Sequence, residues 1–122
     1  VEEESEKWVK ELGVATKDHM LPVQTLSGGN QQKVVLARWL ASEPKVLILN
    51  GPTVGVDIGA KYDIHNLLRQ LAAQGMAILV VSDDASEVIA TCDRAIVMQA
   101  GRVTGNLSEK DLNADTLAQA AL

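Results

Sequence analysis

Apolar residues along this chain form two kinds of pattern, short uninterrupted runs and helical spacings. The runs Val46–Leu49 and Ala77–Val81 lack polar alternation, which is typical of strands buried on both faces of a parallel sheet. Between them, apolar positions recur at i, i+3, i+4 and i+7, which predicts an amphipathic helix that ends at Gly75. Those positions are Ile64, Leu67, Leu68 and Leu71.

Further helices are expected on either side of these strands. One spans the glutamate-rich residues 1–12 and ends at Gly13, and another begins just after Gly28-Gly29 and stops before Pro44. The apolar face of the second helix consists of Val35, Leu36, Trp39 and Leu40. A third helix is indicated by the helical spacing of Ala85, Val88, Ile89 and Cys92.

The C-terminal part of the chain is expected to hold a hairpin and one more helix. Ala95–Met98 and Val103–Thr104 flank Gly101, which is typical of two short paired strands. Residues 108–122 are predicted to be helical, with Ser108 as the N-cap. Because helices and strands alternate, the connections should be crossovers, and we expect an α/β fold with a mainly parallel sheet flanked by helices.

Composition places the chain among globular proteins and narrows its partners. It has 122 residues, of which 47% are hydrophobic, and its formal net charge is −5. This acidic balance argues against nucleic acid as a partner, because a phosphate-backbone binder needs a basic face. The longest apolar run, Met76–Val81, is far shorter than the roughly 20 residues of a spanning helix. The single Cys92 excludes an internal disulfide, and the two histidines, His19 and His65, suggest no metal site by their spacing.

Other conspicuous side chains are expected to have structural roles. Trp8 and Trp39 are most simply packing anchors, and Cys92 lies on an apolar helical face and belongs to the core. Lys33 and His65 are expected at the surface or its boundary.

The segment Leu26–Lys33 is the strongest candidate for ligand binding. Adjacent Gly28 and Gly29 let the backbone approach a ligand closely, and a helix that begins there directs unpaired N–H groups and its positive dipole end to the same spot. The hydroxyl of Ser27 adds one more donor. Together these groups suit a phosphate. The alternative is a serine-capped helix with a flexible glycine lead-in.

Leu26–Lys33 resembles the signature motif of ABC-type ATPases, in the variant with Asn30-Gln31-Gln32 that is similar to sugar-importing ABC transporters. Val46–Asp57 resembles the Walker B strand and the D-loop of that family, and the resemblance continues to the segment around Cys92–Arg94 and the hairpin at Gly101. It implies a P-loop NTPase-like nucleotide-binding domain that dimerises head to tail. ATP is then held between the phosphate loop of one half and the signature of the other.

The resemblance also implies the domain organisation. Residues 1–42 would be the end of the helical subdomain with the signature and its helix, 43–107 the Walker B strand, D-loop and C-terminal part of the α/β core, and 108–122 a C-terminal helix. No Gly-x-x-x-x-Gly-Lys-Ser/Thr occurs among the nine glycines, so the phosphate-binding loop is missing. The chain is therefore expected to be the C-terminal piece of a nucleotide-binding domain. The resemblance to sugar importers, which fuse two such halves in one polypeptide, favours the second half.

Three positions depart from the family pattern. Asn50 and Gly51 stand where the family has the Asp-Glu pair of the Walker B strand, and Asp83 aligns with the switch histidine. A neutral amide is a poorer magnesium ligand than a carboxylate, and glycine offers no base; loss of a general base alone commonly costs about 10²–10⁴-fold. Each change alone could be a neutral substitution at a loop position that tolerates change. Together they favour a site that does not hydrolyse ATP.

The signature itself is intact and is expected to complete an ATP site in trans. Ser27, Gly28, Gly29, Asn30 and Gln31 would contact the γ-phosphate of a nucleotide that another half holds. In the same assembly, the D-loop aspartate of the family would lie at the dimer seam. That position is Asp57, although a helix N-cap explains this residue equally well.

The resemblance implies the energy-coupling ATPase subunit of a bacterial sugar importer. ATP and Mg²⁺ belong to the full assembly, and none is expected on this piece alone, which should be soluble and inactive by itself. Its partners would be the other nucleotide-binding half, the membrane permease at the cytoplasmic face, and indirectly a periplasmic sugar-binding protein. Two alternatives stay open: an ABC ATPase of DNA repair or translation, and a catalytically inactive regulatory or dimerisation half.

Overall fold

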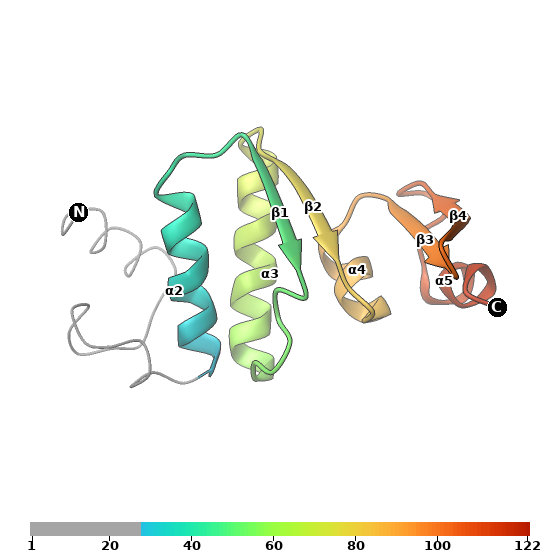
Figure 1. The fold of residues 1–122 in the computed structure, drawn as a ribbon, viewed down its shortest axis with the longest axis horizontal. Coiled ribbons are helices and arrows are strands. Elements are labelled where there is room, and N and C mark those ends of the chain that lie inside the picture. The colour runs from blue at the N-terminus through green and yellow to red at the C-terminus, as the bar shows by residue number, and fades with distance from the viewer. Residues whose placement is uncertain (1–27) are drawn as a thin grey trace.

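The computed structural model describes residues 28–122 of the chain (Figure 1). Its elements, in order, are α2 (Gly28–Leu40), β1 (Val46–Asn50), α3 (Ile58–Ala73), β2 (Ala77–Val81), α4 (Ala85–Thr91), β3 (Ala95–Gln99), β4 (Arg102–Leu107) and α5 (Ala114–Ala120). The expected helix over residues 1–12, Trp8 and Ser27 lie outside this part of the chain. From Gly28 onward, the predicted alternation of helices and strands is confirmed.

The strands form two separate pairs. β1 and β2 are parallel, in register from Val46 opposite Ala77 to Asn50 opposite Val81, and α3 is the crossover between them. β3 and β4 are antiparallel, with a register shift between Val97 and Met98. The predicted parallel pairing and the predicted hairpin are therefore both present, but within residues 28–122 the hairpin is not hydrogen-bonded to the parallel pair.

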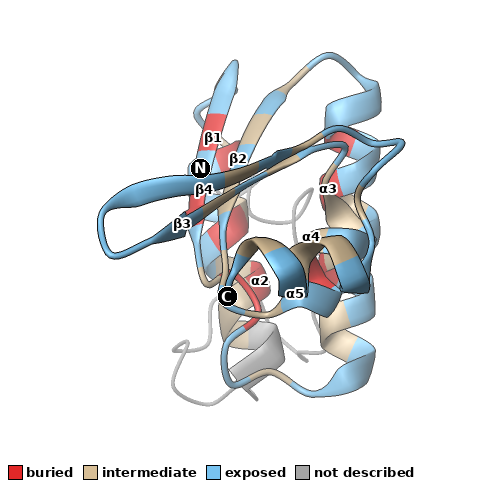
Figure 2. Ribbon diagram, turned by 90° about the vertical axis from the view of Figure 1, so that its right-hand side faces the viewer, coloured by how far each residue is buried: buried red, intermediate tan, exposed pale blue. Residues whose placement is uncertain are grey.

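Packing of α2 and α3 against one face of β1 builds the core, seen as red segments in Figure 2. Every second residue of β1 is buried, because successive side chains of a strand point to opposite faces. α3 contributes the stripe that its sequence spacing predicted, although Leu67 is only partly buried. The buried apolar residues are Leu36, Leu40, Leu47, Leu49, Ile64, Leu68 and Leu71.

The expectation that β1 is buried on both faces is wrong for this structure. Val46 and Ile48 point away from the helices, and the side chain of Ile48 is 67% exposed. The predicted apolar face of α2 divides in the same way: Leu36 is buried, whereas Trp39 is 64% exposed and is not a packing anchor. These uncovered side chains line an open, mainly apolar hollow of about 410 Å³ between α2 and β1. One face of the parallel pair is thus covered and the other is not.

Several local expectations need correction. Lys33 is not at the surface: it is 4% exposed, and its Nζ donates to Asp63 Oδ2 at 2.9 Å, so α2 is tied to α3. Cys92 is the half-buried C-cap residue of α4 and is not a member of the buried core.

The last helix does not begin after Ser108, because Asn113 forms a capping box with Thr116 and starts α5 at Ala114. Asparagine and serine both cap helices through a side-chain oxygen, and here the reciprocal bonds with Thr116 are made by Asn113, whereas the Ser108 hydroxyl donates to Asp111.

Within residues 28–122, no helix combines the length and the apolar character that crossing a membrane requires.

Replacing Leu68 by alanine in the protein that contains this chain should lower the free energy of unfolding by about 2–5 kcal/mol, because the change leaves a cavity between α3 and β1. Urea denaturation followed by circular dichroism measures the loss. Leu122→Ala is the matched control: this leucine is exposed, and its removal should change stability by less than about 0.5 kcal/mol. Equal losses in both variants would contradict the assignment of the core.

Candidate functional site

The carboxyl ends of β1 and β2 lie side by side and form the candidate site. The last residue of β1, Asn50, pairs in register with the last residue of β2, Val81. The parallel pairing therefore brings the predicted positions Asn50 and Gly51 next to the segment that carries Asp83. In open α/β sheets, ligands bind at this end of the strands.

Gly51 adopts a backbone conformation that other residues avoid. Its φ is +58°, and its N–H donates to the Val81 carbonyl at 2.8 Å, which extends the link between the two strands. A Cβ atom at this position would lie 2.9 Å from Cγ2 of Val54. A glutamate at position 51 would thus meet both left-handed strain and a steric contact.

The donor atoms at this end do not fit a protein-bound magnesium ion. Asn50 and Asp83 are exposed, and the asparagine offers only a neutral carbonyl oxygen where Mg²⁺ prefers carboxylate oxygens. From Gly28 to Leu122, no three His, Cys, Asp or Glu side chains gather where they could hold a metal ion. At the β1 end itself, neither Asn50 nor Gly51 supplies a carboxylate oxygen for a metal ion.

Asp57 acts as the N-cap of α3. Its Oδ1 accepts a hydrogen bond from the Ala60 N–H at 2.8 Å, and its backbone is extended. The capping role that the sequence allowed is thus present. A role of Asp57 at a dimer seam stays a prediction.

The glycine pair opens a helix, as the sequence indicated. Gly28–Asn30 form the first residues of the 13-residue helix α2, and Gln31 is half-buried. In Figure 1 the N-terminal end of α2 and the carboxyl end of β1 point to the same side of the molecule. Phosphate binding by Ser27 to Gln31 stays a prediction.

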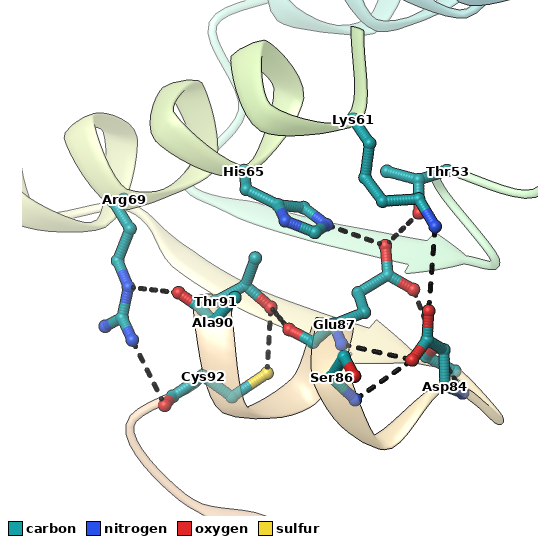
Figure 3. Close-up of polar contacts among 11 residues, drawn as sticks. Thr53, Lys61, His65, Arg69, Asp84, Ser86, Glu87, Ala90, Thr91 and Cys92 are labelled. Atoms are coloured by element: carbon teal, nitrogen blue, oxygen red, sulfur yellow. Dashed lines mark hydrogen bonds and ion pairs between the residues drawn. The ribbon is translucent and has the colours of Figure 1, made fainter. Parts of the chain in front are cut away.

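A buried polar cluster next to this site was not foreseen. We call Thr53, His65, Ser82 and Glu87 the Glu87 cluster (Figure 3). Oε1 of Glu87 accepts from the Thr53 hydroxyl at 2.5 Å and lies 3.2 Å from Nε2 of His65, while Oε2 accepts from the Ser82 hydroxyl at 2.6 Å. Glu87 is 3% exposed and is the one buried residue of α4.

The charge of Glu87 is stabilised by these donors. Burial by itself raises the pKa of the Glu87 carboxyl, but the hydrogen bonds from Ser82, Thr53 and His65 and the nearby imidazole charge outweigh it, so the pKa lies below its ordinary value. Because an ionised carboxylate only accepts hydrogen bonds, Nε2 of His65 must carry a proton toward Oε1. The carboxylate is therefore charged at neutral pH and contributes stability that is lost as the pH falls through its lowered pKa.

Polar contacts around the cluster tie α4 to its neighbours. Asp84 caps α4 by accepting from the amides of Ser86 and Glu87, and its other oxygen lies 3.6 Å from Nζ of Lys61 on α3. The Thr91 hydroxyl donates to the Glu87 carbonyl at 2.7 Å. At the far end of α4, Arg69 donates to Asp93 at 2.7 Å.

A sequence signal at Glu87 exists, but it points to a different structure. Asp84 followed three residues later by Glu87 matches the capping-box spacing, in which the glutamate bonds back to the amide of the cap residue. In the structure Ser82 Oγ accepts from the Asp84 N–H instead, at 3.0 Å, and the carboxylate of Glu87 turns inward. His65, expected at the boundary, is half-buried as part of this cluster.

Comparison with known proteins identifies the family. The family model described as "ABC transporter" matches residues 1–54. The chain is 50% identical to the ribose import ATP-binding protein RbsA 1 of Streptomyces coelicolor over 114 residues. The alignment covers 93% of this chain and 23% of the relative. It is 44% identical over 114 residues to the L-arabinose transport ATP-binding protein AraG of Geobacillus stearothermophilus, with 93% and 22% covered.

Among solved structures, the fold is similar to the dimeric ATP-binding cassette MJ0796 in a post-hydrolysis state bound to ADP and Pi. The TM-score is 0.78 and the identity 26%, over 88% of this chain and 46% of that one. The chain thus spans about a quarter of the curated relatives and about half of a solved cassette. The fold class and the resemblance that the motifs indicated are confirmed. This chain belongs to the ABC transporter family, and its relatives are named as ATP-binding proteins of ribose import and L-arabinose transport.

Proposed function

We propose that this chain is part of the ATP-binding, energy-coupling subunit of a bacterial sugar importer. The support is its identity of 50% and 44% to proteins named for ribose import and L-arabinose transport. Because these relatives are named for different sugars, we propose sugars as the substrate class and assign no single sugar.

The β1–β2 end of this chain is proposed to be a silent nucleotide site. The observation that carries this proposal is Gly51, which supplies no general base and has a left-handed backbone that the family's glutamate would adopt only with strain. Asn50 adds no anionic oxygen beside it. ATP hydrolysis would then take place at a different site of the assembly.

The signature residues are proposed to complete that other site. A helix that begins at Gly28 has its positive dipole end there, which would suit a γ-phosphate contacted by residues Ser27 to Gln31. The phosphate loop, the magnesium ligands and the catalytic carboxylates would come from another nucleotide-binding half. The similar cassette MJ0796 is a dimer bound to ADP and Pi, and this supports a role for two cassettes together.

The uncovered face of β1 is proposed to pack against the rest of the cassette. The exposed Val46 and Ile48 and the neighbouring Trp39 form an apolar surface, and this chain covers 46% of the similar cassette MJ0796. In this arrangement residues 1–42 end the helical subdomain, 43–107 complete the α/β core and 108–122 form the C-terminal segment. Burying those side chains would stabilise the assembled domain.

The partners follow from the importer assignment. We propose as partners the other nucleotide-binding half, in the same polypeptide or in a dimer, a membrane permease at the cytoplasmic face, and indirectly a periplasmic sugar-binding protein, with ATP and Mg²⁺ as cofactors of the assembly. The second candidate function is a catalytically inactive regulatory half, which the Asn50-Gly51 pair favours equally well. ATP turnover of the full-length protein distinguishes the two.

Replacing Ser27 by arginine in the full-length protein should reduce ATP turnover by about 10²-fold or more, because the bulky side chain displaces donors that act on developing charge. Steady-state phosphate release measures the effect. Ser108→Arg is the matched control, since Ser108 is exposed and remote from α2 and β1, and it should leave turnover unchanged. Wild-type turnover in the Ser27→Arg protein would contradict the proposal, and a wild type without turnover would favour the inactive half.

Restoring the family residues at the β1 end should not restore catalysis. The double change Asn50→Asp with Gly51→Glu is expected to leave ATP turnover at or below the wild-type rate and to destabilise the fold by about 1–3 kcal/mol, because residue 51 is left-handed. Thermal unfolding measures the loss.

A pair of alanine variants separates steric contact from backbone strain at the same loop. Gly51→Ala should cost more stability than Gly55→Ala, because both glycines have positive φ but a Cβ at Gly55 meets no atom within 4 Å. Val54 is 79% exposed, so Val54→Ala should be nearly neutral alone and should reduce the cost of Gly51→Ala. Equal costs at the two glycines would contradict the steric argument.

A further inference from the structure

We propose that Glu87 is a positioning residue that holds the loop after β1 and the loop after β2 together as one unit through Thr53 and Ser82. The proposal deepens the proposed function and rests on it for its effect on ATP turnover. Its structural part, the coupling of the two loops, does not depend on nucleotide.

The carboxylate of Glu87 joins three elements that are far apart in sequence. Thr53 lies in the loop between β1 and α3, His65 on α3, and Ser82 directly after β2, and each contributes a polar atom within 3.2 Å of a Glu87 oxygen. Both oxygens of the carboxylate are therefore engaged, Oε1 toward the first loop and Oε2 toward the second. A single rigid side chain thus bridges the two loops.

Burial makes this bridge costly to open. Glu87 and Thr53 are each 3% exposed, so water cannot readily replace a donor that moves away. A buried carboxylate that loses a donor bears the desolvation cost of its charge without compensation. Displacement of either loop is therefore opposed by the bonds to the other loop.

The two loops carry the positions on which the proposed mechanism depends. The first loop begins at Gly51 and leads to Asp57, which starts α3, while Ser82 directly precedes Asp83. Apart from Glu87, a backbone hydrogen bond from Gly51 to Val81 also joins the two strand ends. That bond lies at the strand tips, so Glu87 is the contact that reaches the loops beyond them. If Asp57 lies at the dimer seam, Glu87 sets its position relative to the β2 end.

Amide hydrogen exchange of the full-length protein tests the coupling without nucleotide. In Glu87→Ala, amides of both loops, Gly51–Asp57 and Ser82–Asp84, should exchange about tenfold faster or more, because both hydroxyls lose their acceptor. In Ser82→Ala, the faster exchange should extend to the loop of Thr53, with which Ser82 shares no direct bond. Faster exchange confined to the loop of the substituted residue would overturn the proposal.

Thr91→Val is the matched control for a general loss of stability. It removes a hydrogen bond to the backbone carbonyl of Glu87 in the same helix and leaves the carboxylate untouched. The two loops should keep wild-type exchange rates in this variant. If they exchange as fast as in Glu87→Ala, the role of Glu87 is merely structural and the proposal is wrong.

Steady-state kinetics of the same proteins tests the consequence for turnover. Glu87→Ala should lower kcat for ATP hydrolysis severalfold and change KM for ATP by less than about twofold, since the phosphate loop that binds ATP belongs to the other half. Glu87→Gln keeps one acceptor oxygen and should recover part of kcat. A raised KM with unchanged kcat would overturn the positioning role. Wild-type kinetics together with uncoupled loops would instead overturn only its link to the proposed function.

Discussion

The parallel pairing of β1 with β2 is the constraint on which the rest of the described structure depends. It is made possible by the crossover helix α3, whose apolar stripe packs against the buried side of β1. Because both strands run in the same direction, their carboxyl ends meet at one edge. Each polar feature with a functional interpretation, from Asn50 to the Glu87 cluster, lies at or beside that edge.

Charge is distributed unevenly around this edge. The carboxylate of Glu87 is buried, ionised and surrounded by donors, whereas Asp83 is exposed and Asn50 is neutral. The buried charge of Glu87 thus has a structural role. The exposed positions Asn50 and Asp83 provide only one carboxylate between them. This arrangement suits an end of the sheet that keeps its shape without performing hydrolysis.

The proposed difference in roles between two nucleotide-binding halves accounts for these features together. In the proposed assembly, Gly51 and Glu87 hold the loops of the silent site, and the glycine-led start of α2 would contact a nucleotide held elsewhere. The apolar side chains left uncovered on β1 point to the same conclusion, because they suit further parts of a cassette. In the proposed assembly, a half without hydrolysis of its own would still contribute to hydrolysis at the other site.

Much of the fold could be predicted from the sequence because it depends on local spacing. The apolar runs predict β1 and β2, the i, i+3, i+4, i+7 stripe predicts α3, and the motif at Leu26–Lys33 indicates the family. Helix ends were less certain, as Asn113 rather than Ser108 caps α5, since several residues near a helix start can accept the same hydrogen bond.

Tertiary structure alone decided which side chains are buried and which polar groups meet. Lys33 is buried because Asp63, 30 positions away, supplies its partner, and Glu87 turns inward because Thr53 and Ser82 come from other elements. The same holds for Gly51, whose N–H bonds to the carbonyl of Val81, 30 positions away. The sequence determined the elements and the family through contacts between near neighbours. The polar contacts of the site join residues that only folding brings together, so no local sequence pattern predicts those pairs.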